Sequence, residues 1–297
     1  MKKLAKTFAV ISAVLLLFAL LVGALFHIFT DKVWVKKEYG RIDIEAQSGY
    51  STEDAAYVLG AMMDYSIGRF DELDKVSVEE NGEHVLFFNE SELSHMVDVR
   101  ALTLNVLRLG LAALIVGLAF FITMFIVLRG EGLRRFAKAF LITLGVLLIV
   151  MVALGVWMAV DFDSFWAMFH VVFLDLESST FDPAVSRMIR ICPGELFSDF
   201  IKHFALIAGI GLLVPVTASI LFLCFKKRLP GAAETPRTIY LSAYWSWLAI
   251  YGAYALTQIR TFLFIAIGLL IVGLILYVVF LKRAKRNGHK VKERIDR

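Results

Sequence analysis

The stretch FAVISAVLLLFALLVGALFHIF, residues 8–29, contains no acidic residue, lysine or arginine. A helix needs about 20 mainly apolar residues to cross the ~30 Å hydrocarbon core of a bilayer. The stretch meets this requirement and therefore predicts a membrane-spanning helix. It is also longer than the roughly 7–15 apolar residues of a secretory signal core, so we expect the span to be retained rather than cleaved.

Similar apolar runs recur along the rest of the chain. The sequence of 297 residues is 59% hydrophobic, and its mean hydropathy of +0.73 excludes a water-soluble globular protein. We predict an all-α polytopic membrane protein with about six transmembrane helices, in which a four-helix core is followed by a C-terminal helical pair. The further predicted spans are residues 102–128, 140–160, 204–225, 239–256 and 262–281.

The distribution of charge predicts the orientation of these spans. Most of the 31 lysine and arginine residues fall in the first six residues, in two short loops and in the C-terminal tail, whereas most of the 27 acidic residues fall in the alternate segments. Because positive loops stay in the cytoplasm, we expect both termini inside and the acidic segments 30–100 and 161–203 outside. The basic segments then indicate contact with membrane phospholipids, and no nucleic-acid partner is expected.

The chain therefore divides into alternating membrane and extracytoplasmic segments. Residues 30–100 are predicted to form a small α+β module, because Ser51 and Asp54 have the spacing of a helix cap and Asn81-Gly82 is typical of a hairpin turn. The predicted segments are 1–29 (first span), 30–100 (module leading into the second span), 101–160 (second and third spans), 161–203 (interfacial segment), 204–225 (fourth span), 226–281 (C-terminal pair) and 282–297 (basic cytoplasmic tail).

The interfacial segment is rich in aromatic residues, which anchor helices in the headgroup zone. Asp163 or Ser164 is expected to cap a helix that bears His170. Asp182 followed by Pro183 is expected to start another helix, because proline favours the first helical position.

Two of the six histidines stand out as candidate site residues. His95 and His170 each lie on a predicted helix at the outer membrane boundary with carboxylates nearby. Asn89 is expected to cap the helix of His95 with Glu92 at its third position, and Asp98 lies three residues after His95, on the same helical face. We predict no metal site, no cofactor and no disulfide between the two cysteines.

The motifs FFNESELSHMVDVR, residues 87–100, and WAMFHVVF with FDPAVSRMIRICPGELF, residues 166–173 and 181–197, together resemble the bacterial lipoprotein intramolecular transacylases (Lit) of Gram-positive bacteria. The resemblance covers about residues 1–225. It implies a cell-membrane acyltransferase that moves the sn-2 acyl chain of a diacylglyceryl-modified lipoprotein to the α-amine of its N-terminal cysteine. It also implies that His95 and His170 are the catalytic pair.

The residues are compatible with this chemistry, because two imidazoles can take a proton from an amine and give one to a leaving oxygen. We assign His95 as acceptor, oriented by Asp98, and His170 as donor or as partner of the oxyanion. The polar supports that we expect are Asn89, Arg100 and Asp182. Two alternatives stay open: a non-enzymatic scaffold or sensor whose extracytoplasmic module binds a ligand and whose C-terminal helix pair docks a partner, and a membrane hydrolase or acyltransferase that acts on another lipid.

Overall fold

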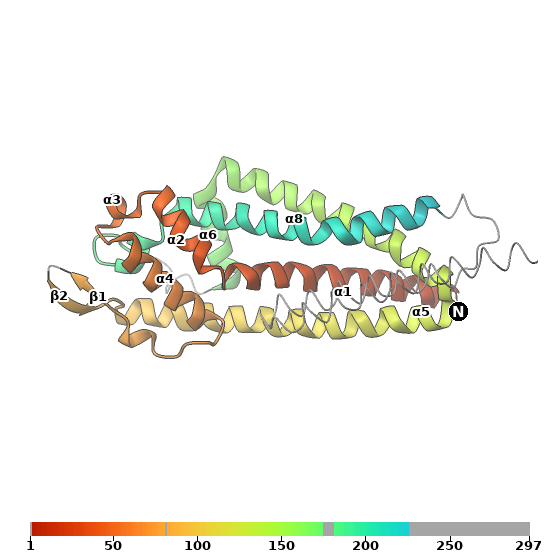
Figure 1. The fold of residues 1–297 in the computed structure, drawn as a ribbon, viewed down its shortest axis with the longest axis horizontal. Helices are drawn as coiled ribbons and strands as arrows, with labels where there is room; N and C mark the ends of the chain where they lie inside the picture. The colour runs from red at the N-terminus through yellow and green to blue at the C-terminus, as the bar shows by residue number, and fades with distance from the viewer. Residues whose placement is uncertain (1, 81, 175–180, 226–297) are drawn as a thin grey trace, which may run out of the picture. The chain divides into compact units, whose positions relative to one another are not determined.

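A computed structural model describes residues 2–80, 82–174 and 181–225 (Figure 1). The predicted spans 239–256 and 262–281, the tail and Asn81 lie outside the described residues. The elements follow in the order α1 (Lys2–Ile28), α2 (Lys32–Arg41), α3 (Ile44–Ser48), α4 (Thr52–Ser66), the 3₁₀ turn η1 (Leu73–Lys75), β1 (Ser77–Glu80), β2 (Glu83–Leu86), α5 (Glu90–Val160), α6 (Phe162–Phe173), α7 (Arg187–Ile191) and α8 (Gly194–Phe225).

Four stretches of described helix are long and apolar enough to cross a membrane, which agrees with four of the six predicted spans. They are Lys6–Ile28, Glu90–Met124, Gly132–Val160 and Gly194–Leu223. Three of them begin about ten residues before the predicted span, because the helix continues through polar residues that sequence hydropathy leaves out. The described residues divide into a first unit (within 2–23, 110–148 and 208–225) and a second unit (within 24–109, 149–174 and 181–207).

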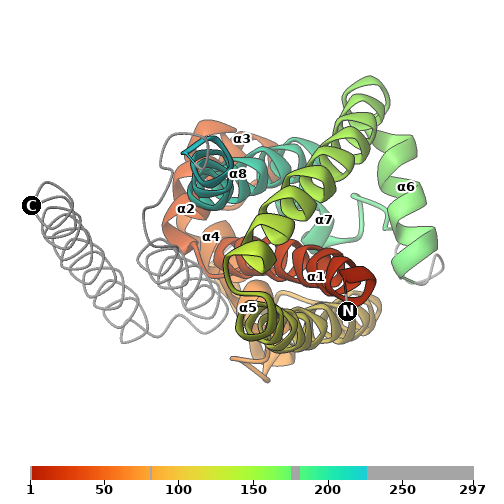
Figure 2. The same cartoon turned by 90° about the vertical axis from the view of Figure 1, so that its right-hand side faces the viewer.

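In the first unit, helices pack closely against one another at small residues. The hydroxyl of Ser12 donates to the carbonyl of Gly117 at 2.9 Å, and a Cβ on Gly110 would lie 2.4 Å from a methyl of Val22. Small residues let α1 and α5 approach closely, which is the usual source of helix association in lipid. The rings of Phe121 and Phe136 lie 4.9 Å apart, although fifteen residues of straight helix would separate them by ~22 Å, so α5 turns back on itself within this unit (Figure 2).

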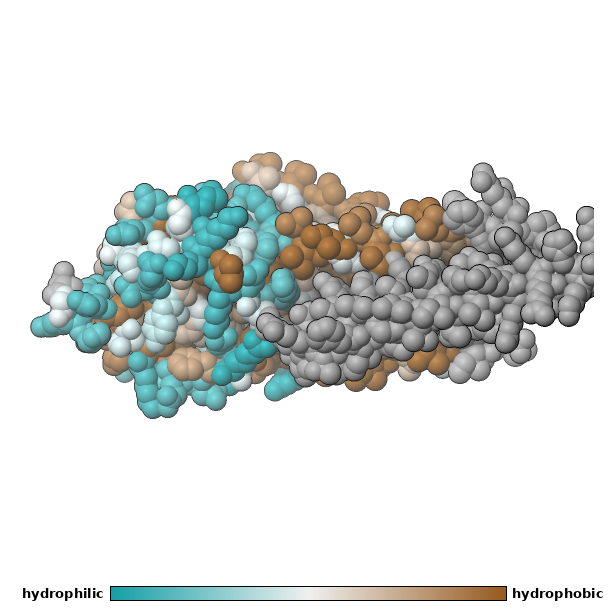
Figure 3. Space-filling model, viewed as in Figure 1, coloured by the Kyte–Doolittle hydropathy of each residue, from teal (hydrophilic) through white to brown (hydrophobic). Residues whose placement is uncertain are grey.

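The second unit holds the polar module. Ser51 accepts from the backbone of Asp54 at 3.0 Å, as its spacing predicted, and α4 buries one face. The two strands pair antiparallel with Val78 opposite Val85, so the predicted hairpin is confirmed. On the face shown in Figure 3, hydrophilic side chains gather over α2, α3 and the hairpin.

The core of this unit joins segments that are distant in sequence. Buried apolar residues of α2, α4 and the hairpin pack with residues of α5 and α7 in one cluster. The hydroxyl of Tyr39 donates to the carbonyl of Ile191 at 2.6 Å, and burial raises the pKa of this phenol. The start of α5, which carries His95, and the segment around α7 are thereby held together, and α6, which carries His170, belongs to the same unit.

Candidate active site

His95 lies in the second turn of α5. Asn89 caps this helix: its side-chain oxygen accepts from the backbone of Glu92 at 2.9 Å, and Glu92 accepts from the backbone of Asn89 at 2.8 Å. The predicted capping box is therefore present, and the helix runs without interruption into the second span. The imidazole of His95 is only 8% exposed, because the first turns of α5 bury the face that carries it.

His170 lies near the end of α6 and is 9% exposed. Its Nδ1 is 2.8 Å from the carbonyl oxygen of Trp166, one turn earlier in the same helix. A carbonyl oxygen only accepts, so Nδ1 carries the hydrogen and, in the neutral ring, Nε2 carries the free lone pair. This local contact fixes which nitrogen of His170 can take up a proton.

The two imidazoles come together in the second unit. Their ring centroids are 6.1 Å apart and their planes differ by 21°, although 75 positions separate them in the sequence. In acyl transfer, the attacking and departing atoms are bonded to the same carbon in the tetrahedral intermediate. An acid and a base must then each come within about 2.6–3.2 Å of neighbouring atoms, so two imidazoles must lie close together to share this work.

Aromatic side chains enclose the pair. The ring of Phe181 meets His95 edge-on at 5.3 Å, and Trp166 meets His170 at 4.8 Å. Phe169 lies 5.6 Å from His170, and Trp166 also packs on Phe197 at 4.3 Å. Apolar walls exclude water and strengthen the electrostatic effect of the groups inside. From the sequence, Trp166 was expected only among the aromatic anchors of the headgroup zone and Phe181 had no predicted role, although a tryptophan one helical turn before a histidine is a signal of such a contact.

The helix of His170 begins differently from the prediction. Its cap is Asp161, whose carboxylate accepts from the backbone of Ser164 at 3.0 Å, and not Asp163 or Ser164. The N-cap residue must itself lie outside the helix, and the long helix α5 ends at Val160, so the single residue between the two helices takes this position.

The prediction of a helix starting at Asp182 and Pro183 is also wrong. These residues form one turn in which the carbonyl of Asp182 accepts from Val185 and Ser186, and α7 begins only at Arg187, capped by Ser186. Residues 182–185 are exposed, so packing against the core does not stabilise a helix there. Ser186 is buried and its hydroxyl donates to Glu92 at 2.5 Å, which fixes the cap at this position.

The predicted supporting residues lie in different surroundings. Asp98 is half-buried on α5, three residues after His95, whereas Asp182 is exposed and its carboxylate accepts from the backbone of Ala184. Arg100 donates to Asp71 at 2.5 Å and to the carbonyl of Phe70 at 3.2 Å, which attaches α5 to the loop before η1. At 100° per residue, Arg100 points ~140° away from His95 around the helix.

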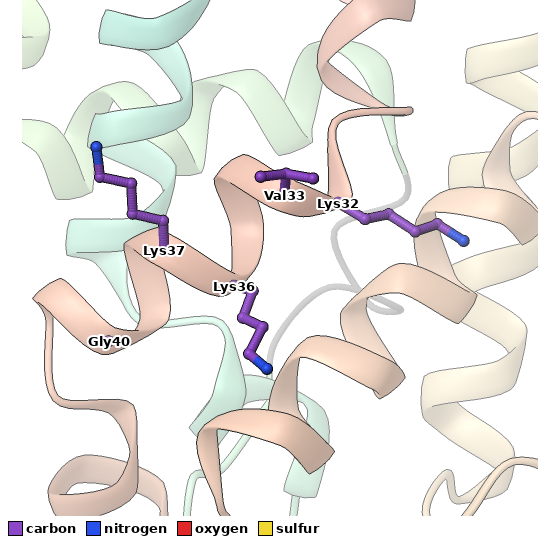
Figure 4. A pocket seen from close by; sticks show the side chains of 5 residues that line it. All are labelled: Lys32, Val33, Lys36, Lys37 and Gly40. Carbon is purple, nitrogen blue, oxygen red and sulfur yellow. The ribbon is translucent and has the colours of Figure 1, made fainter.

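Two other polar features are separate from the histidine pair. An open hollow of about 540 Å³ lies along α2, lined by Lys32, Val33, Lys36, Lys37 and Gly40 (Figure 4). Two of its three amines are neutralised, since Lys32 pairs with Asp64 of α4 and Lys36 pairs with Glu53. Near the end of α1, the carboxylate of Asp31 lies 3.4 Å from His203 and 3.9 Å from His27.

Cys192 is buried with a free thiol. Burial, and secondly the nearby negative charge of Glu92, raise its pKa to about 12, so it stays protonated and is not a nucleophile at neutral pH. Among the described residues, no group of three or more histidine, cysteine or acidic side chains has the arrangement of a metal site.

A model of the family "Lipoprotein intramolecular transacylase Lit" matches residues 10–197 of the chain, which include both histidines. No curated protein matches. Three solved structures of the membrane-integral lipoprotein intramolecular transacylase Lit from Bacillus cereus are similar in fold. One shares 14% identity at a TM-score of 0.58, with 76% of this chain and 96% of that one covered. Another, in which a histidine is replaced by alanine, shares 13% identity at a TM-score of 0.59, with 77% and 97% covered.

Proposed function

Because this chain belongs to the lipoprotein intramolecular transacylase (Lit) family and is an acyltransferase of the membrane, we propose that it moves the sn-2 acyl chain of a diacylglyceryl-modified lipoprotein onto the α-amine of that lipoprotein's N-terminal cysteine. The observation that carries this proposal is the approach of His95 and His170 to 6.1 Å within an aromatic enclosure. The family implies a lipoprotein substrate. The acyl position and the catalytic pair are our inference.

The reaction balances without a cofactor. The amine nitrogen attacks the ester carbonyl and forms the new N–C bond, and collapse of the tetrahedral intermediate breaks the bond between that carbon and the glycerol oxygen. One proton leaves the nitrogen and one proton reaches the departing oxygen. The products are an amide and a free glycerol hydroxyl in the same molecule, and the greater stability of the amide drives the transfer.

The contact of His170 with Trp166 favours a definite division of roles. Because Nδ1 of His170 donates to the carbonyl, its Nε2 is the proton acceptor for the amine. His95 then supplies the proton for the glycerol oxygen, which reverses the order of roles that we assigned from the sequence. Transfer of one proton from His170 back to His95 through water restores both rings. Such acid–base assistance is worth roughly 10²–10⁴-fold in rate.

The remaining acceleration comes from holding the reactants together. The amine and the ester belong to one lipoprotein, and an oriented intramolecular reaction reaches effective molarities of about 10⁵ M or more. We propose that the site faces the extracytoplasmic leaflet, with residues 1–225 forming the enzyme. In this arrangement the acyl chains stay in lipid while the amine reaches the histidines. Asp98 and Asn89 act as polar supports of His95 through their places on the first turns of α5.

The test is to express the full chain in a bacterium that makes diacylated lipoproteins and lacks this activity. Mass spectrometry of the N-terminal lipopeptide should then find one acyl chain on the cysteine nitrogen and one on glycerol. A free-amine diacyl lipopeptide from cells with abundant membrane-inserted protein would refute the proposal. A lyso-lipopeptide with a free amine, together with released fatty acid, would identify a hydrolase instead.

A further inference from the structure

Glu92 is a completely buried carboxylate in the first turn of α5, three residues before His95. An ionised carboxylate only accepts hydrogen bonds, and its burial is costly unless donors surround it. Its sequence position predicts only a local role, in the capping box of α5. The structure gives it partners in a second, distant segment as well.

The two oxygens of Glu92 divide these partners between them. Oε2 accepts from the backbone of Asn89 at 2.8 Å, within α5. Oε1 accepts from the hydroxyl of Ser186 at 2.5 Å and from the backbone of Met188 at 2.9 Å, at the start of α7. Hydrogen bonds to a charged acceptor are about twice as strong as neutral ones, so this carboxylate fastens the start of α5 to the start of α7.

Both fastened segments form part of the histidine site. His95 is on the turn of α5 that follows Glu92, and Phe181, whose ring edge meets His95 at 5.3 Å, lies five residues before Ser186. Ser186 itself caps α7, with its hydroxyl 3.2 Å from the backbone of Ile189. A movement at Glu92 would therefore change the position of the imidazole and of the wall beside it together.

We propose that Glu92 is a positioning residue of the transacylase: it holds α5 against residues 186–188 so that His95 faces His170 at reacting distance. This inference rests on the proposed function of the two histidines. Glu92 acts through the backbone that carries His95 and through the segment that carries Phe181. Removing its charge should therefore lower kcat and leave the binding of substrate nearly unchanged.

The test compares Glu92→Gln, Glu92→Asp and the control Glu38→Gln in full-length protein acting on a synthetic diacylglyceryl lipopeptide. Glutamine keeps the length of the side chain but presents an amide donor to the backbone N–H of Asn89. Its kcat should fall about 10–100-fold, the size of effect found for residues that orient metal-ligating histidines, with KM within about twofold. Glu92→Asp retains the charge and should recover part of kcat. Glu38 is buried and bonded to Arg41, so its variant should lose stability but keep kcat.

A readout independent of turnover is the nitrogen NMR spectrum of ¹⁵N-histidine-labelled protein, assigned with His95→Gln and His170→Gln. Glu92→Gln should shift the ring signals of His95 and leave those of the exposed His84 unchanged. Unshifted His95 signals, a raised KM with normal kcat, or activity that falls only with the folded fraction would each overturn the positioning role. Wild-type protein that makes no N-acylated product, while its His95 signals still respond to Glu92→Gln, would refute the proposed function and leave the positioning role standing.

Discussion

The two helices that carry the candidate histidines are held in place by different forces. The start of α5 is fixed by directional hydrogen bonds: the capping box of Asn89 and Glu92, and the bonds from Glu92 to residues 186 and 188. Helix α6 is twelve residues long, and its aromatic rings pack on neighbouring helices, Trp166 on Phe197 of α8 and Phe165 on Trp157 of α5.

The difference shows how each side of the site responds to change. A buried hydrogen-bond network fails sharply, because each donor left without its acceptor costs about 1–3 kcal/mol. Aromatic packing fails gradually, because its contribution follows the apolar area and ring contacts that are removed. We therefore expect His95 to depend on single polar groups and His170 to depend on the bulk of its neighbours.

The largest expected effect is the loss of either imidazole. His95→Asn and His170→Asn should each lower the rate of N-acylation by about 10²–10⁴-fold, because each removes one proton-transfer group. Mass spectrometry of the lipopeptide product measures the rate, and His84→Asn on the exposed hairpin is the matched control. If one variant kept at least half of the wild-type rate, that histidine would not be part of the catalytic pair, and the comparison between the two helices would lose its functional meaning.

Local sequence patterns predicted the parts of the molecule that depend on neighbouring residues. The four described spans follow from apolar length, and the caps at Ser51 and Asn89 follow from spacing. The hairpin follows from its turn. In each case the physical cause lies within one continuous segment, so the sequence of that segment was sufficient for the prediction.

The parts that escaped prediction depend on long-range contacts. Nothing near His95 reveals that residue 170 lies beside it. The cap of α7 moved from Asp182 to Ser186 because a hydroxyl 94 positions away from Glu92 binds that carboxylate. Because the sequence does not reveal this contact, Glu92 looked like a purely local capping residue. A carboxylate on the buried face of an apolar helix was the available signal, since it must find donors elsewhere in the fold.

The second prediction tests the aromatic side of the comparison. Trp166→Leu removes the ring contacts to His170 and Phe197, and should lower the rate of N-acylation about 2–10-fold, since one aromatic pair is worth about 0.5–1.5 kcal/mol. Trp157→Leu is the matched control, because Trp157 packs on Phe165, at the other end of α6 from His170. Equal rate losses in the two variants would mean that the contact of Trp166 with His170 has no special effect.

The third prediction concerns the caps of the two helices. Asp161→Ala should destabilise the protein by about 1 kcal/mol, because α6 loses the side chain that binds its first turn. Asn89→Ala should cost more, since Glu92 then loses half of a reciprocal pair. Thermal unfolding in detergent measures both. Asp163→Ala is the control and should change stability by less than about 0.5 kcal/mol. A larger loss for Asp163→Ala than for Asp161→Ala would favour the cap that the sequence suggested.

The smallest expected effect is a pH dependence of stability, caused by the ion pair that joins the hairpin to α7. The Arg187 guanidinium, 2.8 Å from Glu80, lowers the pKa of that carboxyl from its usual 4.5, and partial burial opposes the shift. The ion pair therefore stabilises the fold above pH ~4.5 and is lost as the pH falls through the lowered pKa.

Between pH 5 and pH 3, wild-type Tm should fall more than that of Glu80→Gln, which has no carboxylate to protonate. Glu79→Gln, on the exposed neighbouring position, should follow the wild type. Parallel curves for wild type and Glu80→Gln would show that the hairpin is held to α7 by apolar contacts alone, and polar fastening would then be confined to the start of α5.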